Sequence, residues 1–371
     1  MHSKNHRLEA FHMDCLIPQP RRFSISEKDK GFTLIELMIA LVLGLLISAA
    51  ALQIFYTSSV NSRHQEASSQ IQDNAIFGFS QMQKNLRRTN YGAKSTSAHD
   101  EYFMNHLTPQ GGVVLTAPVG ASGKWLEGNL SGLVLGGAAI SSDWLSNNAS
   151  IKSVSNLNGI ANSDQLTIQY QSGQEESYDC EGDQIPKDFY VIERYFVRMD
   201  NTSNPATPGL ACASAIYDYN ESAAGSASGI DIKQYTVPAK TTPPTAPATV
   251  KANNLLDVGT IIIPNVDYFR VMLGVSNSTG FATYPDRTRI AYMPIPVSRT
   301  LAADQRIVSL QIGILARSDN PTATPQTNSN LSFTVLDKAN VKLNTAAIAG
   351  PTYLRNVYET TVLLRNARGG L

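Results

Sequence analysis

The stretch KGFTLIELMIALVLGLLISAAALQIFY, residues 30–56, decides the fold of this chain. From Phe32 to Tyr56 it holds a single charged residue, Glu36. About 20 apolar residues in a helix cross a hydrocarbon core of ~30 Å, so residues 32–56 are predicted to form a transmembrane helix. Basic residues precede it and favour a cytoplasmic N-terminal flank with the rest of the chain outside: Arg21, Arg22, Lys28 and Lys30.

The apolar run is too long for the core of a secretory signal peptide. Such a core has roughly 7–15 apolar residues and is followed by a cleavage site of small residues. Ala49–Ala51 imitates such a site, but helix-forming sequence continues beyond it. The segment is therefore predicted to remain in the protein as an anchor.

Glu36 lies where a charge is expensive, since an acid inside a membrane helix costs about 2.5–3.5 kcal/mol on insertion scales. One explanation is local, because Thr33-Leu34-Ile35-Glu36 fits a capping box at a helix start. The other requires a cut between Gly31 and Phe32. The new α-amino group of one subunit would then pair with Glu36 of its neighbour and fix the axial register of packed helices.

Lys30-Gly31-Phe32-Thr33-Leu34-Ile35-Glu36 resembles the processing signal of type IV pilins and type II secretion pseudopilins. The resemblance implies a leader over residues 1–31, which a prepilin peptidase removes by cutting after Gly31. It also implies methylation of Phe32 by the same enzyme and a role for Glu36 in assembly. The leader is longer than is usual in the family, and a start at Met13 would shorten it.

The helix is predicted to continue as an amphipathic helix over residues 57–92. One face is apolar and is made by residues three or four apart: Ile71, Ala75, Phe79, Met82 and Leu86. Lys84, Arg87 and Arg88 suit the negative end of the helix dipole, and Gly92 is the predicted C-cap.

Residues 93–371 are predicted to form a β-rich head that covers this apolar face. Alternation and β-branched or aromatic content predict strands at 166–170, 189–197, 213–219, 258–263, 307–315, 331–336 and 357–364. Residues 268–275 fit a strand, or a short helix leading into one. Residues 201–251, with their Ser, Thr and Pro, and residues 316–330 are predicted to be surface loops. The fold class is α+β, with a long N-terminal helix on an antiparallel sheet.

Two cysteines beyond the anchor, Cys180 and Cys212, suggest a disulfide in an oxidising compartment. It would close a loop of about 33 residues, for which the loop-entropy model gives roughly 3–4 kcal/mol. Two free buried thiols are the alternative.

Motifs for catalysis or for metal and cofactor binding are missing from the sequence, so a non-enzyme without a cofactor is predicted. Residues 120–125, GASGKW, imitate a phosphate loop but lack its first Gly and its Ser/Thr, and read as a turn. Oxygen-bearing residues 178–184 could ligate calcium, but their spacing is not that of an EF-hand, and a solvated loop is the simpler interpretation.

Arg355 and Arg365 are predicted to form surface ion pairs, or to contact another subunit. Equal numbers of basic and acidic residues, 30 each, indicate no direct binding of nucleic acid.

The resemblance extends to the PilW-like minor pilins through residues 71–92, 266–276, 305–318 and 353–370. It implies a type IV minor pilin that primes pilus assembly in a tip complex with other minor pilins and the major pilin. The inner-membrane assembly platform would be a further partner. The body would lie in the periplasm before assembly and in the surface pilus afterwards, so that twitching motility, adhesion and DNA uptake follow from the filament. Alternatives are a type II secretion pseudopilin like the J component, a tip adhesin that uses the divergent middle region, and a membrane-anchored enzyme.

Overall fold

A computed structural model describes residues 31–93, 104–120, 125–134, 142–174, 177–203, 206–219, 230–232, 235–237, 249–251, 255–277, 290–302, 305–322 and 331–367. The chain divides into two compact units, residues 1–57 and 58–371, which are described separately. Residues 1–30 of the predicted leader, Met13 and Cys15 among them, lie outside the described residues. So do most of the TTPPTAPAT run and residues 121–124 of the predicted GASGKW turn.

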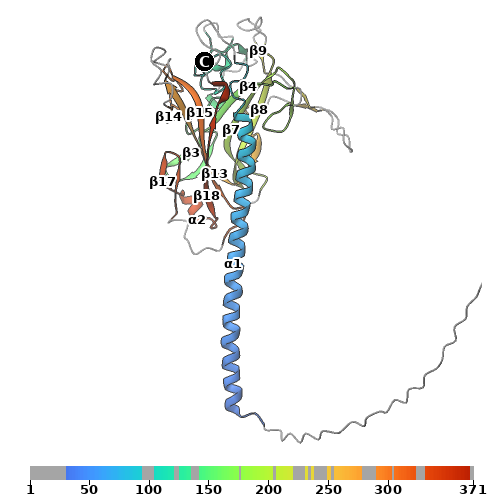
Figure 1. Ribbon diagram of the computed structural model, residues 1–371, viewed down its shortest axis with the longest axis vertical. Helices are drawn as coiled ribbons and strands as arrows, with labels where there is room; N and C mark the ends of the chain where they lie inside the picture. The colour runs from blue at the N-terminus through green and yellow to red at the C-terminus, as the bar shows by residue number, and fades with distance from the viewer. Residues whose placement is uncertain are drawn as a thin grey trace, which may run out of the picture. The chain divides into compact units, whose positions relative to one another are not determined.

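One long helix, α1 (Leu34–Leu86), confirms the predicted N-terminal helix (Figure 1). It ends earlier than predicted. Arg88 N–H donates to the Asn85 carbonyl at 2.9 Å, which is a tighter turn than an α-helix makes, and Asn90 N–H then donates to a strand residue, Gln169. The chain has left the helix before it reaches Gly92, so the prediction of Gly92 as the C-cap is wrong.

The first sheet of the head has the strand order β12-β8-β7-β4, and every neighbouring pair is antiparallel. Its strands are β4 (Leu166–Gln171), β7 (Tyr190–Asp200), β8 (Thr207–Tyr217) and β12 (Thr260–Ile263). The predicted spacer at 201–251 is therefore wrong as a single loop, because β8 is a buried strand within it. The strand predicted at 213–219 forms the second half of β8, whereas its first half was not predicted. Small residues such as Ala211, Ala213 and Ser214 let β8 lie deep in the head.

The second sheet has the order β14-β13-β15-β18 and is also antiparallel. Its strands are β13 (Val266–Asn277), β14 (Ile290–Pro294), β15 (Gln305–Arg317) and β18 (Arg355–Leu363). The ambiguous segment at 268–275 is thus a strand. β15 runs into the predicted loop at 316–330, of which residues 323–330 lie outside the described residues.

Short elements complete the head. Pairs of strands are β1 (Leu133–Val134) with β9 (Ile230–Asp231), β2 (Val154–Leu157) with β3 (Ile160–Asn162), β5 (Ser177–Tyr178) with β6 (Gln184–Ile185), β10 (Tyr235–Val237) with β11 (Thr249–Lys251), and β16 (Ser332–Val335) with β17 (Lys338–Lys342). The helix α2 spans Thr345–Ala349, and 3-10 turns span Gly128–Leu130, Ser142–Trp144 and Arg365–Ala367.

The second half of α1 packs into the head through the predicted apolar face. Ile71, Ala75, Phe79, Met82 and Leu86 are all buried, and they join residues of both sheets in one hydrophobic core. Gly78 allows the helix to lie against β12, because a Cβ there would come within 2.1 Å of the Ile263 side chain.

Buried ion pairs link distant parts of the head. Arg355 Nε lies 2.7 Å from an Asp267 oxygen, and both side chains are at most 1% exposed. Arg270 contacts Asp164 at 3.1 Å, with both side chains 1% exposed, and Asp337 at 2.7 Å. The prediction of a surface ion pair is therefore wrong for Arg355, whose partner on β13 is far away in the sequence. Arg365 is exposed.

Candidate processing and assembly site

The bond predicted to be cut lies in open, non-helical chain before α1. Phe32 is 87% exposed, and no atom lies within 4 Å of the position that a Gly31 Cβ would occupy. α1 begins two residues after Phe32, at Leu34. Both residues of the Gly31–Phe32 bond are therefore exposed.

Glu36 closes a capping box at the start of α1. Its Oε2 accepts hydrogen bonds from the Thr33 backbone N–H and from the Thr33 hydroxyl, both at 2.9 Å. The Glu36 N–H in turn donates to Thr33 Oγ1 at 3.3 Å. The capping box, which is the local explanation for Glu36, is thus formed in the uncut chain. The pairing of Glu36 with a neighbour's amine stays a prediction.

The first unit exposes a continuous apolar helix surface. Every described residue of this unit, Gly31 to Thr57, is exposed, including Leu45, Ile47 and Phe55 at 63%, 69% and 73%. The helix is long and apolar enough to cross a membrane. Because this surface finds no cover within its own unit, it requires lipid or other helices around it.

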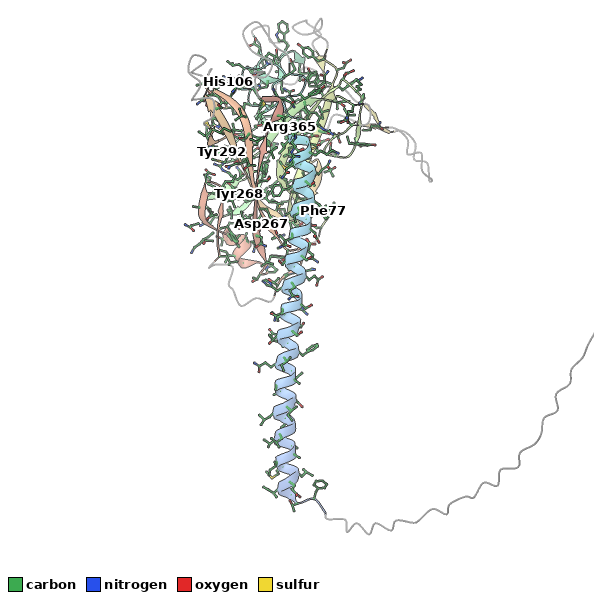
Figure 2. The ribbon with its side chains drawn as sticks, viewed as in Figure 1. Phe77, His106, Asp267, Tyr268, Tyr292 and Arg365 are labelled. Carbon is green, nitrogen blue, oxygen red and sulfur yellow. A yellow bond between two sulfur atoms is a disulfide. The ribbon has the colours of Figure 1, made fainter. Side chains whose placement is uncertain are left out.

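The helix also exposes apolar side chains within the second unit. Phe77, labelled in Figure 2, is 73% exposed. Ile76 is 60% exposed, although the neighbouring Ala75 and Phe79 are buried in the head. This part of α1 therefore has two apolar faces, one covered by the sheets and one without cover among the described residues of the head.

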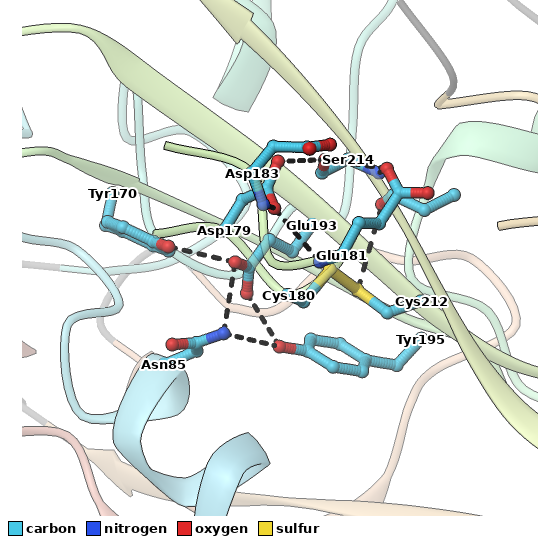
Figure 3. The surroundings of a disulfide bond; sticks show 11 residues. Asn85, Tyr170, Asp179, Cys180, Glu181, Asp183, Glu193, Tyr195, Cys212 and Ser214 are labelled. Atoms are coloured by element: carbon cyan, nitrogen blue, oxygen red, sulfur yellow. Dashed lines mark hydrogen bonds between the residues drawn. A yellow bond between two sulfur atoms is a disulfide. The ribbon is translucent and has the colours of Figure 1, made fainter. Parts of the chain in front are cut away.

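A buried acid fixes the C-terminal end of α1 to the first sheet (Figure 3). Glu193 of β7 accepts hydrogen bonds from Asn85 Nδ2 of α1 at 3.1 Å and from the hydroxyls of Tyr170 at 2.9 Å and Tyr195 at 2.6 Å. Burial raises the pKa of Glu193 to about 7, opposed by the Tyr195 hydrogen bond and supported by the nearby Asp179 carboxylate. Burial likewise raises the pKa of both tyrosines, with the charge of Glu193 adding to it.

The predicted disulfide is confirmed. Cys180 and Cys212 are bonded, with their Cα atoms 6.1 Å apart, and both residues are buried. The bond connects the hairpin of β5 and β6 to β8, immediately beside Glu193 (Figure 3).

Two carboxylates of residues 178–184, the segment considered as a possible calcium ligand, accept hydrogen bonds within the protein. Asp179 Oδ1 accepts the N–H groups of Glu181 and Asp183, and Asp179 Oδ2 and Glu181 Oε2 both accept the Ser214 hydroxyl. In the part of the chain that the structure describes, no group of three or more His, Cys, Asp or Glu residues is arranged to hold a metal ion.

The sequence analysis did not predict that Asn85, Arg88 and Glu193 connect the end of α1 to the β-strands of the head. Two signals were present. Asn85 is a polar residue within the buried face of α1, and Glu193 interrupts the apolar and aromatic run of β7. Their pairing could not be read from the sequence, because it joins positions 108 residues apart.

Two family models match the chain. The model described as type IV pilus-assembly protein W matches residues 234–366, and the prokaryotic N-terminal methylation motif matches residues 27–52. Among solved structures, a type IV-like pilin from Thermus thermophilus is similar at 12% identity over 55% of this chain and 80% of that pilin, with a TM-score of 0.22. No curated protein matches the chain.

Proposed function

We propose that this chain, which belongs to the PilW-like type IV minor pilins, primes pilus assembly within a complex of minor pilins at the pilus tip. One observation supports this most strongly: a single acid, Glu36, lies in the fully exposed apolar segment of α1, residues 34–56, directly after the exposed Gly31–Phe32 bond. A simple membrane anchor needs neither the acid nor the accessible bond.

Processing is proposed to occur at that bond. A prepilin peptidase on the cytoplasmic side cuts after Gly31 and methylates the new N-terminal Phe32. The cut replaces an amide by a positively charged amine, four positions before Glu36. The N–H of Thr33 belongs to the next peptide bond and is not changed by the cut. The mature chain therefore keeps the capping box and gains a cation at its end.

Glu36 can serve as a cap and as a partner for a neighbour's amine at the same time. Both hydrogen bonds from Thr33 go to Oε2, and none of the hydrogen bonds among the described residues goes to Oε1. The second oxygen is thus available to the amine of an adjacent subunit. An ion pair inside an apolar bundle fixes one axial stagger, since removing one partner of a buried pair costs about 3–5 kcal/mol.

The exposed apolar face of residues 34–56 is proposed to lie in the inner membrane first and then among the helices of other pilins. The head is proposed to lie in the periplasm and later on the pilus. We assign the chain a structural rather than a catalytic role, and the major pilin is proposed to add beneath the primed complex.

The test is a strain that lacks this protein and receives it back as wild type or with Glu36→Ala. The variant is expected to insert in the membrane and to be processed, but to lose co-isolation with partner pilins and to restore few pili. Glu66→Ala is the matched control, because it removes an exposed acid of the same helix outside the apolar segment. Normal piliation with Glu36→Ala would contradict the proposal, and co-isolation with secretion pseudopilins alone would assign the chain to that system instead.

A further inference from the structure

A small hairpin, residues 177–185, lies between the end of α1 and the first sheet. β5 and β6 pair through only two residue pairs, Ser177 with Ile185 and Tyr178 with Gln184. A two-stranded hairpin of this size is not stable by itself in water. Its position therefore depends on the bonds that it makes to the rest of the head.

Toward the sheet, the hairpin is held by β8. Cys180 is bonded to Cys212, and Ser214 donates its hydroxyl to Asp179 at 2.6 Å and to Glu181 at 2.8 Å. The Ser214 N–H also donates to Glu181 at 3.0 Å. Only the disulfide among these bonds is covalent.

Toward the helix, the hairpin receives Arg88, just beyond the end of α1. Its Nη1 donates to Ser177 Oγ at 3.0 Å and to the Tyr178 carbonyl at 3.4 Å. The Cys180 N–H donates to Glu193, the same carboxylate that accepts the Asn85 amide of α1. The hairpin thus supports the end of the helix directly and through Glu193.

Like charges oppose this arrangement. Asp179 and Glu181 share one hydroxyl donor, and Asp179 also acts on Glu193 through its charge. Arg88 brings one positive charge to the hairpin, through its hydrogen bonds to Ser177 and Tyr178. When the disulfide is broken, repulsion between these carboxylates favours movement of the hairpin away from β8.

We propose that the Cys180–Cys212 disulfide is a redox-dependent clamp that holds the end of α1 in the head through the hairpin at 177–185. Reduction breaks the S–S bond and leaves two thiols: a dithiol reductant supplies two electrons and two protons and becomes a disulfide, whereas a phosphine supplies two electrons, takes its oxygen from water to become the phosphine oxide, and water supplies the two protons. The hairpin then leaves β8, Arg88 loses its two acceptors, and Glu193 loses the Cys180 N–H. A thiol–disulfide oxidant reverses the step by accepting two electrons and two protons. The clamp is distinct from pilus priming, because it concerns how the helix is joined to the head.

Hydrogen–deuterium exchange of the full chain in detergent micelles tests the clamp, with and without a phosphine reductant. Reduction is expected to raise amide exchange about tenfold or more in residues 177–185 and in residues 83–90, which cover the end of α1 and the turn after it. Exchange in β13 and β15 is expected to stay unchanged. The Cys180→Ser/Cys212→Ser chain is expected to show the fast exchange already and no response to the reductant.

Arg88→Gln tests the connection without touching the disulfide. It is expected to raise exchange at residues 83–90 while residues 177–185 stay protected. An unchanged helix end after reduction would overturn the proposal. An equal rise in β13 and β15 would overturn it too, since the disulfide would then stabilise the head in general.

Discussion

At the scale of single residues, Glu36 combines a local and an intermolecular task. The capping box uses one carboxylate oxygen, and the proposed amine partner would use the other. The local task requires only a hydrogen-bond acceptor, whereas the intermolecular task requires a negative charge. Substitutions can therefore separate the two.

Glu36→Gln keeps an acceptor for Thr33 but removes the charge. We expect it to abolish most co-isolation with partner pilins. Thr33→Ala removes the hydroxyl of the cap but keeps the charge, at a cost of about 0.5–2 kcal/mol in helix stability, and should leave co-isolation nearly normal. Equal losses in both variants, measured by pull-down from solubilised membranes, would contradict a role for the charge.

The raised pKa of Glu193 predicts an unusual pH dependence of the free energy of unfolding. Its pKa is about 7 in the folded chain against an ordinary value of 4.5, so the folded state binds the proton more tightly. The free energy of unfolding should therefore fall as the pH rises from about 4.5 to about 7, by roughly 2–3 kcal/mol. Glu193→Gln should remove most of this fall in denaturant titrations. An equal fall in the free energy of unfolding with pH in Glu193→Gln would contradict the attribution of this fall to Glu193.

At the scale of elements, α1 presents one face to the head and another outward. Phe79 is buried and Phe77 is 73% exposed, although they are two positions apart. The same residue type is thus expected to stabilise the fold at one position and to contact a partner at the other.

Phe77→Ser is expected to change head stability by less than about 0.5 kcal/mol but to weaken co-isolation with partner pilins. Phe79→Ala should lower the free energy of unfolding by about 3–5 kcal/mol. Denaturant titration and pull-down of both variants provide the comparison. Normal co-isolation of Phe77→Ser would show that the outward face is not a contact.

Gly78→Ala reverses the usual effect of this substitution in a helix. Ala is normally favoured over Gly by about 1 kcal/mol. Here the added Cβ would meet Ile263 at 2.1 Å, so the helix and β12 must move apart. We expect a loss of about 1–3 kcal/mol in the free energy of unfolding. A more stable variant would contradict the close packing of α1 on β12.

At the scale of the whole molecule, periodic patterns predicted the long helix and most strands of the two sheets. For β8 the pattern predicted only the second half, within residues 213–219, because the first half, with small residues such as Ala211, lacks the β-branched signature. It also failed for Arg355, whose burial depends on Asp267, a partner remote in sequence. The cysteine pair was predictable because few pairings were possible, whereas the contact of Asn85 with Glu193 depends on the packed fold.

The central claim is that the chain is cut after Gly31 and enters a filament as a processed pilin. Mass spectrometry of the N-terminal peptide, from protein isolated from membranes and from pili, tests it most directly. We predict a mature chain that begins at Phe32 and carries one methyl group on its amine. An intact leader on the protein in pili would contradict the account.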